Sequence, residues 1–321
     1  MKLAGAVEPI FDEGAVAALH EVTFGIPRRI GGNPEIGRAL DWGLKRRWVV
    51  GLGVLGLLGG TAALAVGSLV YALGGDDGRG RRFHPLFQMQ LLGINGAFLT
   101  GDLFNLFVFF EILLIASYAL QVHGGGTRRI RAALHLVVLN LIGSAVFLIG
   151  IGAIYAAAGS LNLADLSARV AAAGPEQAGL LRAGGLLLLL VFGLKAALVP
   201  VGFWLPPAYG SASPSVAALF AIMTKVGVYA ILRVHGLVFG PEAGPAASLL
   251  TPWLVPLGLV SIAVATLGVL ASRELRRMLA YLVVVSAGSW SVSVRMNREP
   301  TPTSTNSTIA DANMLLMIRA L

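Results

Sequence analysis

Long apolar runs alternate with short polar segments along most of the chain, a pattern typical of a protein that crosses a membrane several times. Windows long enough to cross about 30 Å of hydrocarbon predict eight membrane helices. They cover residues 48–73, 84–101, 103–122, 131–157, 181–205, 214–235, 251–271 and 278–290. The polar loop at 159–180 favours a short surface helix. The sequence therefore predicts an all-α fold, a polytopic transmembrane helical bundle.

Both ends of the chain differ from this apolar middle. Residues 1–47 are a polar N-terminal extension without an apolar run of signal-peptide length, so they predict neither a signal sequence nor a span. Residues 291–321 are a polar C-terminal tail whose Thr, Ser, Pro and Asn content is typical of a disordered segment. The predicted transmembrane domain is therefore 48–290.

Composition and charge narrow the function classes. Hydrophobic residues make up 56% of the chain and charged residues 12%, a balance that excludes an ordinary soluble domain. The net charge of +8 does not indicate nucleic-acid binding, because the arginines cluster between the apolar runs, where they anchor loops. Three clusters, at 79–82, 128–131 and 273–277, fall on one side of the membrane, and a modest positive-inside bias favours the cytoplasm for that side. The cluster at 45–47 falls on the other side and opposes this orientation.

Redox and metal chemistry find no support in the sequence. Cysteine is absent, which excludes disulfides, thiolate-bound iron–sulfur clusters and covalently attached haem. No spacing of His, Asp and Glu indicates a set of metal ligands. We therefore expect no cofactor and no metal, and any redox chemistry would belong to a partner.

Three charged residues lie inside predicted spans: Glu111 in GDLFNLFVFFEILLIASYAL, Lys195 in LLLLLVFGLKAALVPVGFWL and Lys225 in ALFAIMTKVGVYAIL. A charge near the bilayer centre costs about 2.5–3.5 kcal/mol on insertion scales, so such residues usually pair, line water or carry ions. An interfacial or snorkelling position is the alternative, but apolar flanks on both sides favour a functional role. Pro200, which follows Lys195 in the same span, predicts a helix break like those of the discontinuous helices in transporters.

The types of these residues predict a proton relay. Burial disfavours the charged form of a lysine, whereas a nearby carboxylate favours it. Movement of Glu111 relative to Lys195 would therefore switch proton uptake into release, and Lys225 would be the next relay site. His135 and His235 are weaker candidates for the same path. Three amides within the spans, of Gln88, Asn95 and Asn140, are better explained as interhelical hydrogen bonds than as relay members.

Three longer stretches of the chain carry a family resemblance. They read RRFHPLFQMQLLGINGAFLTGDLFNLFVFFEILLIASYAL, FGLKAALVPVGFWLPPAYGSASPSVAALFAIMTKVGVYAILR and ELRRMLAYLVVVSAG. Over about residues 68–289 the chain resembles the D subunit of Mrp-type multisubunit sodium/proton antiporters, which is homologous to the antiporter-like subunits of respiratory complex I. The resemblance implies a fold of inverted repeats, each with a broken helix. The first repeat would cover 84–235 and a partial second repeat 251–290.

The resemblance also implies roles for the charged residues. By motif, Glu111 matches the carboxylate of the family's fifth helix, Lys195 the lysine of its broken seventh helix and Lys225 the lysine of its eighth. The implied partners are the other subunits of an Mrp-type complex, protons, sodium ions and the lipid bilayer, with no nucleic acid. The implied location is the cell inner (plasma) membrane, as a multi-pass protein. Members of this family have more helices on both sides, so we expect a truncated or frameshifted reading frame without the later exit lysine.

Three interpretations of function remain at this point. The first is a proton-translocating subunit of a sodium/proton antiporter, a transporter subunit rather than a classical enzyme. The second is a proton-pumping subunit of complex I, an NADH:quinone oxidoreductase, or of a related hydrogenase. The stretch GDLFNLFVFFEILLIASYAL, and FWLPPAY in place of an HWLP-type sequence, favour the first over the second. The third is an inactive, truncated structural fragment, favoured by the missing second half of the fold.

Overall fold

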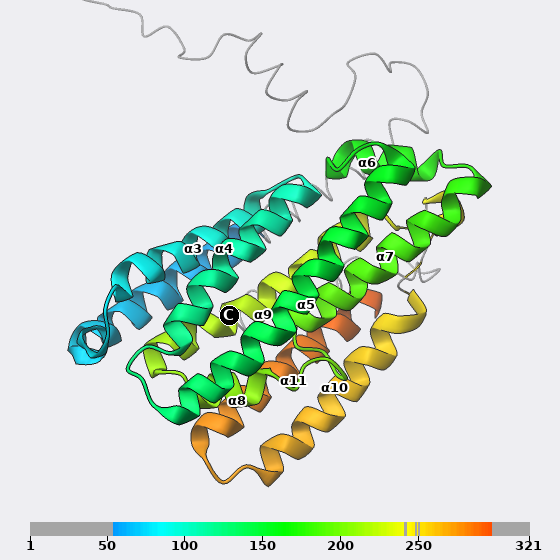
Figure 1. Ribbon diagram of the computed structural model, residues 1–321. Coiled ribbons are helices and arrows are strands. Elements are labelled where there is room, and N and C mark those ends of the chain that lie inside the picture. The colour runs from blue at the N-terminus through cyan, green and yellow to red at the C-terminus, as the bar shows by residue number, and fades with distance from the viewer. Residues whose placement is uncertain (1–53, 241–242, 248, 250, 297–321) are drawn as a thin grey trace, which may run out of the picture. The chain divides into compact units, whose positions relative to one another are not determined.

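The computed structural model describes residues 54–240, 243–247, 249 and 251–296. The predicted extension 1–47 and the predicted tail from residue 297 onward lie outside these residues. The described part of the chain is helical, without a β-strand (Figure 1). A first helix begins at residue 54. It continues into a wider turn, the π-helix η1 (Ala72–Asp76), and then into a tighter turn, the 3-10 helix η2 (Asp77–Arg79). The remaining helices are α3 (Phe83–Leu99), α4 (Leu103–Gln121), α5 (Thr127–Ala158), α6 (Leu163–Ala171), α7 (Pro175–Lys195), α8 (Leu205–Ser211), α9 (Pro214–Ala230), η3 (Ile231–His235), η4 (Gly244–Ala246), α10 (Thr251–Ala271) and α11 (Leu275–Met296).

Each of the eight predicted spans corresponds to a helix in the described residues. Six helices are long and apolar enough to cross a membrane, namely Val54–Arg79, Leu103–Gln121, Thr127–Ala158, Pro175–Lys195, Pro214–His235 and Pro252–Ala271. The other two predicted spans are α3, which has only 17 residues, and α11. The predicted surface helix in the loop 159–180 is confirmed as α6. Helix α11 extends to Met296 and so includes the first residues of the predicted tail.

Neighbouring helices pack as pairs. Helix α3 lies beside α4, α5 beside α7, and α10 beside α11 (Figure 1). In the last pair, Gly258 and Gly288 face each other so closely that a Cβ atom built on either would lie 2.9 Å from the carbonyl oxygen of the other. Small residues at such crossings let two membrane helices approach through their backbones.

The beginnings of α4 and α6 are joined at one end of the bundle. Asp102 accepts hydrogen bonds from the backbone N–H groups of Phe104 and Asn105 at 2.8 and 2.9 Å, as an N-cap does. The backbone N–H of Leu103 donates to the Leu161 carbonyl, and that of Leu163 donates to the Gly101 carbonyl, both at 2.9 Å. This cap fixes where α4 begins, and Glu111 then lies about 12 Å along the helix at 1.5 Å per residue.

Helix α7 ends earlier than the sequence predicts. The span was expected at 181–205 with Lys195 in its middle, but Lys195 is the last helical residue and the next helix, α8, begins at Leu205. The helix ends in a Schellman motif, in which the N–H of Leu198 donates to the Gly193 carbonyl at 2.8 Å and that of Ala197 donates to the Leu194 carbonyl at 3.1 Å. Ala197 has a φ of 58°, the left-handed conformation this motif requires. Pro200 therefore lies inside the non-helical stretch between α7 and α8, and backbone caps end the helix before the proline is reached.

Side chains from distant segments hold this break. The indole N–H of Trp204 donates to the Leu194 carbonyl at 2.9 Å, and the hydroxyl of Ser261, on α10, accepts from the backbone N–H of Val199 at 2.9 Å. Buried backbone groups need such partners, because an orphaned N–H or C=O in an apolar interior is costly. The break is therefore part of the packed structure.

Helix α9 passes directly against the break at Gly227. A Cβ atom built there would lie 2.5 Å from the backbone nitrogen of Ala196 and 2.7 Å from the carbonyl carbon of Lys195. Both distances are far below ordinary van der Waals contact, and the obstructing atoms are backbone. Only glycine at this position lets α9, which carries Lys225, lie this close to the end of α7.

We predict that Gly227→Ala destabilises the protein by about 1–3 kcal/mol, because the added methyl group must push two backbones apart. Gly193→Ala is the matched control, since a Cβ at Gly193 meets no atom within 4 Å and alanine is the better helix former by up to about 1 kcal/mol. Thermal unfolding of the detergent-solubilised variants should therefore move in opposite directions. A Gly227→Ala protein as stable as the wild type would contradict the close approach.

Candidate functional site

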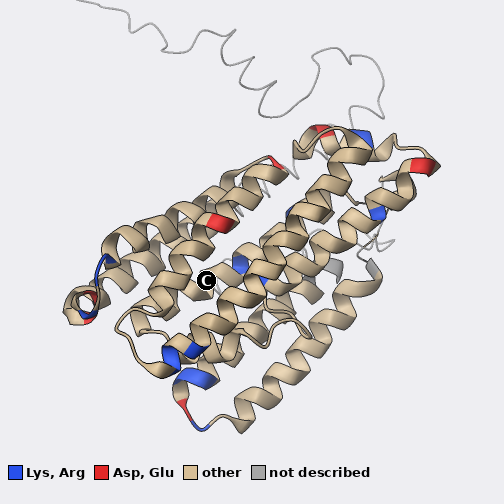
Figure 2. Ribbon diagram, viewed as in Figure 1, with Lys and Arg blue, Asp and Glu red and all other residues tan. Residues whose placement is uncertain are grey.

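Charged residues are unevenly distributed along the helices. Figure 2 shows that most acidic and basic residues lie near helix ends and that few lie along the middle of the bundle. Glu111, on α4, is half-buried, whereas Lys195 and Lys225 are 4% and 9% exposed. These three are the intramembrane charges that the sequence singled out, and the site can be built from their partners.

The carboxylate of Glu111 is bound by a serine of the neighbouring helix. The hydroxyl of Ser144, on α5, donates to Oε1 of Glu111 and also lies 3.0 Å from the carbonyl oxygen of Asn140. A hydroxyl has a single proton, so Ser144 can donate to only one of these two acceptors at a time. Rotation of one hydroxyl group is therefore enough to make or break the contact with Glu111.

Asn140 connects this serine to the first lysine. Its side chain is fully buried, its Nδ2 donates to the Leu136 carbonyl at 2.8 Å, and its Oδ1 accepts from the Lys195 ammonium at 3.0 Å. The amide orientation is consistent with both contacts, because the carbonyl oxygen of the side chain faces the cation and the NH₂ group faces a carbonyl. Asn140 is thus an interhelical hydrogen bond, as the sequence indicates, but its partner is Lys195.

Lys195 occupies a position that favours a cation. It is the last residue of α7, where the unsatisfied carbonyl groups of a helix produce a negative potential. Its Nζ lies 6.0 Å from the centre of the Phe110 ring. No direct ion pair joins Lys195 to Glu111 within the described part of the chain. Two residues lie between them and form a polar series with them. Ser144 contacts Glu111 and the main-chain carbonyl of Asn140, and the side-chain oxygen of Asn140 accepts from Lys195. The series is not one continuous chain of hydrogen bonds, because Ser144 donates to one acceptor at a time and Asn140 uses different atoms for its two partners.

A narrow, mostly apolar gap, too small to admit a water molecule, lies beside the Lys195 ammonium. It is lined by Phe110, Leu113, Leu114, Asn140, Lys195, Trp204 and Met223. Met223 belongs to α9 and comes two residues before Lys225 in the sequence. The lining of this gap therefore includes both Asn140 and Lys195 and a residue of α9, the helix that carries Lys225.

Lys225 has its own partners, and they belong to a later helix. Its Nζ donates to the hydroxyl of Ser286 at 2.5 Å and lies 5.3 Å from the centre of the Trp290 ring, both on α11. No hydrogen bond among the described residues connects Lys225 to Lys195. Their helices meet instead through the backbone contact at Gly227. The polar contacts of Lys225 thus lead onward from α9 to α11.

The two candidate histidines have different environments. His235 is buried at the end of the π-helical turn η3, with its ring 6.4 Å from that of Phe192 and 5.3 Å from that of Phe239. Phe192 in turn packs against Phe110, beside Lys195. His135 lies at an exposed position of α5 and is not part of the polar series. The structure therefore brings His235, but not His135, into the packing around the site.

Two residues of the site were not identified as functional from the sequence. Ser144 was not singled out, and Ser286 lies in a span that was considered only for its length. For Ser144 a signal exists, because Asn140 and Ser144 are four residues apart and therefore share one face of α5. For Ser286 no such signal exists, since only the packing of α11 on α9 brings it to Lys225.

Comparisons with known proteins identify the family of this chain. Residues 100–299 match the model of the family described as NADH:quinone oxidoreductase/Mrp antiporter, transmembrane. The chain is 47% identical over 239 residues to the D subunit of a probable K(+)/H(+) antiporter from Rhizobium meliloti, an alignment that covers 74% of this chain and 44% of that protein. It is 41% identical over 226 residues to the D subunit of the Na(+)/H(+) antiporter from Bacillus subtilis, with 70% and 45% covered. The chain spans about half the length of these relatives.

Solved structures give the same result. The Mrp complex from Dietzia sp. matches with a TM-score of 0.67 and 30% identity, covering 76% of this chain and 45% of that one. An archaeal membrane-bound sulfane sulfur reductase matches with a TM-score of 0.62 and 30% identity, covering 73% and 46%. Respiratory complex I from Thermus thermophilus matches with a TM-score of 0.59 and 27% identity, covering 74% and 51%.

These findings confirm the resemblance to the D subunit of Mrp-type antiporters and the antiporter fold with a broken helix. The apolar helices and the bacterial relatives identify a multi-pass protein of the plasma membrane. The chain belongs to the NADH:quinone oxidoreductase/Mrp antiporter transmembrane family.

Proposed function

We propose that this chain is a proton-translocating membrane subunit of a multisubunit monovalent cation/proton antiporter, with Glu111, Lys195 and Lys225 as its relay. The observation that carries the proposal is the set of polar contacts that places Ser144 and Asn140 between Glu111 and Lys195. Its partners are the other subunits of an Mrp-type complex and the surrounding bilayer. Sodium is the exchanged ion we favour, and potassium is the alternative, since the relatives' names include both.

In this series the charged groups would carry protons, and the neutral groups would position them. An amide does not readily pass a proton, so Asn140 is a positioning residue that holds the Lys195 ammonium 3.0 Å from its Oδ1 and apart from Glu111. Protons would cross the remaining distance when Lys195 moves, and a water-mediated step would require the space beside it to widen first. Because opposite charges stabilise each other, a proton leaving Lys195 changes the field at Glu111, and this coupling links proton uptake at one group to release at the other.

The break between α7 and α8 is the part of the backbone whose movement would accompany proton transfer at Lys195. Lys195 is followed by non-helical backbone whose position depends on hydrogen bonds to Trp204 and Ser261, so a movement there would exchange these few contacts and would not disrupt a continuous helical ladder. The next relay site, Lys225, is on a helix whose backbone touches that same break. A shift of the break would therefore act on both lysines. From Lys225 the proton path would continue toward Ser286 and α11.

A proton-pumping subunit of complex I, or of a related hydrogenase, is the alternative function. The same family model covers both kinds of protein, and the relay would work in either. The match to the Mrp complex has the higher TM-score, 0.67 against 0.59, which supports the antiporter. Iron–sulfur or quinone-reductase subunits that co-purify with the chain would support complex I instead.

We predict that Glu111→Gln, Lys195→Ala and Lys225→Ala each lower cation/proton exchange at least about tenfold, because each removes a titratable group from the relay. Exchange is measured in everted vesicles from a host without its own sodium/proton antiporters, with the chain expressed beside its operon partners. Glu176→Gln, an exposed acidic residue in the first turn of α7, is the matched control and should leave exchange unchanged.

The outcomes of this experiment separate the remaining interpretations. Exchange that survives all three relay substitutions at wild-type abundance would exclude the relay. A wild-type chain that reaches the membrane and assembles but supports no exchange would instead favour an inactive structural fragment.

We predict that Ser144→Ala lowers exchange by about tenfold, the equivalent of losing one hydrogen bond to a charged group. Ser144→Thr keeps a hydroxyl at this position and should restore most of the activity. Because a purely structural role would also change folding, the thermal unfolding midpoint and membrane abundance of both variants are measured in parallel. Equal loss of exchange in the alanine and threonine variants would show that the hydroxyl is not the functional group.

A further inference from the structure

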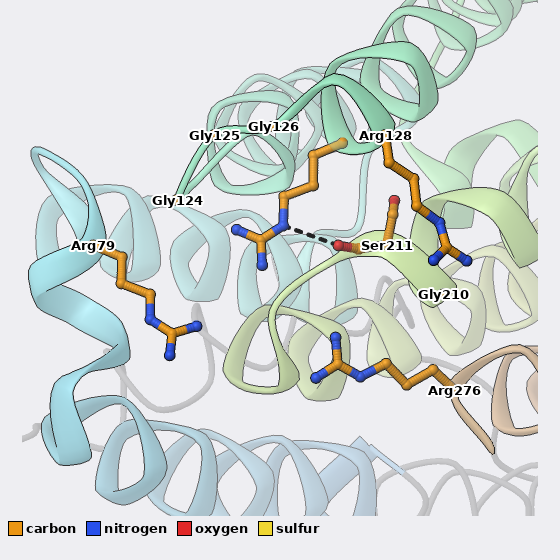
Figure 3. Close-up of a pocket in the computed structure, with 9 residues that line it drawn as sticks. Arg79, Gly124, Gly125, Gly126, Arg128, Gly210, Ser211 and Arg276 are labelled. Atoms are coloured by element: carbon orange, nitrogen blue, oxygen red, sulfur yellow. Dashed lines mark hydrogen bonds between the residues drawn. The ribbon is translucent and has the colours of Figure 1, made fainter. Parts of the chain in front are cut away.

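A second polar site lies at one end of the bundle, separate from the relay. It is a pocket of about 480 Å³ formed where the turn before α5, the end of α8, the beginning of α11 and the end of η2 come together (Figure 3). Its lining residues are Arg79, Gly124, Gly125, Gly126, Arg128, Arg129, Gly210, Ser211 and Arg276. We call it the arginine pocket. Its lining contains four arginines and no acidic residue.

Positive charge remains in excess after the neighbouring carboxylates are considered. Arg128 pairs with Glu274 at 2.8 Å, and Arg79 lies 3.4 Å from Asp76. Arg129 donates to the carbonyl oxygens of Ser211 and His123, which fixes its guanidinium group without neutralising it. Arg276 forms no ion pair within the described ranges of the chain. Among the described residues, the charges of Arg129 and Arg276 are therefore not compensated by a carboxylate. Figure 3 shows Arg79 and Arg276 reaching into the pocket from opposite sides.

Backbone groups add to the same field. Gly124, Gly125 and Gly126 all have positive φ angles, of 80°, 68° and 103°, and they lead directly into the first turn of α5. The N-cap residue Gly126 has no side chain that could bind the exposed N–H groups of that turn. The beginning of a helix carries a partial positive charge and N–H donors that suit an anion. At Gly124 a Cβ atom would collide with the Arg129 guanidinium, so glycine also makes room for that side chain.

The chemistry of the lining selects among anions. Guanidinium groups bind phosphate oxygens through paired N–H donors, and several can share one phosphate. The lining contains no aromatic ring on which a nucleotide base could stack. Sodium and other cations would be repelled. A phosphate group is therefore the anion that this pocket fits best.

The position of the pocket identifies the source of that phosphate. It lies at the ends of membrane-spanning helices, on the side for which the positive-inside bias favours the cytoplasm. Exposed apolar residues are the sequence neighbours of two of its arginines, since Ile130 follows Arg129 and is 48% exposed and Leu275 precedes Arg276 and is 66% exposed, although neither lines the pocket itself. A headgroup bound in the pocket would have apolar surface beside it for its acyl chains. A soluble phosphate compound has no acyl chain that could cover apolar surface.

We propose that the arginine pocket binds the headgroup phosphate of an anionic phospholipid from the cytoplasmic leaflet. Basic pockets between transmembrane helices on this side of a membrane suit anionic lipid headgroups. The phosphate would lie between Arg79 and Arg276 and in front of the first turn of α5. This inference concerns the end of the bundle and does not depend on the proposed relay.

The test uses the full 321-residue chain purified in a neutral detergent, with thermal unfolding followed through its five tryptophans. Phosphatidylglycerol, cardiolipin, zwitterionic phosphatidylcholine and inorganic phosphate are added in separate series. We expect phosphatidylglycerol and cardiolipin to raise the unfolding midpoint by roughly 5 °C when saturating, and phosphatidylcholine to have little effect.

Substitutions of arginines test whether the lipid that raises the unfolding midpoint binds in the arginine pocket. Arg276→Gln should weaken phosphatidylglycerol binding about fivefold, the effect of one basic residue near an anionic surface, and Arg79→Gln with Arg276→Gln should weaken it further. Arg273→Gln is the matched control, because it removes another exposed arginine from the same end of the bundle without touching the pocket. It should behave as the wild type does.

Three results would overturn the proposal. Equal losses in Arg276→Gln and Arg273→Gln would indicate general surface charge and no defined site. Inorganic phosphate that stabilises the protein as much as the lipids do would assign the pocket to a soluble phosphate compound. No response to any lipid or to phosphate would leave an acidic protein partner as the occupant.

Discussion

The burial of the Lys195 ammonium group inside an apolar bundle is the constraint on which the rest of this structure depends. A cation inside an apolar bundle must find partners, and three features provide them together: the carbonyl end of α7, the side-chain oxygen of Asn140 and the ring of Phe110. The first of these exists only because the helix ends at Lys195. The Schellman turn, the left-handed Ala197, the indole of Trp204 and the hydroxyl of Ser261 all hold that ending in place. A continuous helix would leave the lysine surrounded by hydrocarbon.

Each intramembrane charge is held by a neutral hydroxyl or amide, with no opposite charge in direct contact among the described residues. Glu111 is paired with Ser144, Lys195 with Asn140 and Lys225 with Ser286. In a buried salt bridge, neutralising one partner leaves the other charge without compensation, which is strongly destabilising. A direct salt bridge would therefore keep both groups charged. A neutral partner tolerates both the charged and the neutral form of its neighbour. This arrangement suits groups that are proposed to change protonation.

The two ends of the bundle have different chemistry from its centre. At one end, Asp102 and Asn162 cap α4 and α6, and paired backbone hydrogen bonds connect the two helix starts. At another, arginines from three segments, η2, α5 and α11, surround a pocket that the first turn of α5 also lines. Outside the spans, the hydrogen bond and the charge of Arg128 lower the pKa of Glu274, so this carboxylate keeps its negative charge beside the pocket at neutral pH. Charges at these ends are solvated or paired, and those in the centre are few and specific.

The sequence by itself determined the helical class, the approximate position of every described span and the identity of the three intramembrane charges. Long apolar runs and isolated charges are local features, and their cost in a bilayer does not depend on how the helices pack. The quoted motifs also identified the family. Only the tertiary structure decided where α7 ends, because that end depends on Trp204, on Ser261 of α10 and on the close approach of Gly227. It also decided the partners of each charge. Ser144, Asn140 and Ser286 come from helices far from their partners in the sequence, and hydrogen bonds between helices follow from packing, which no local pattern encodes.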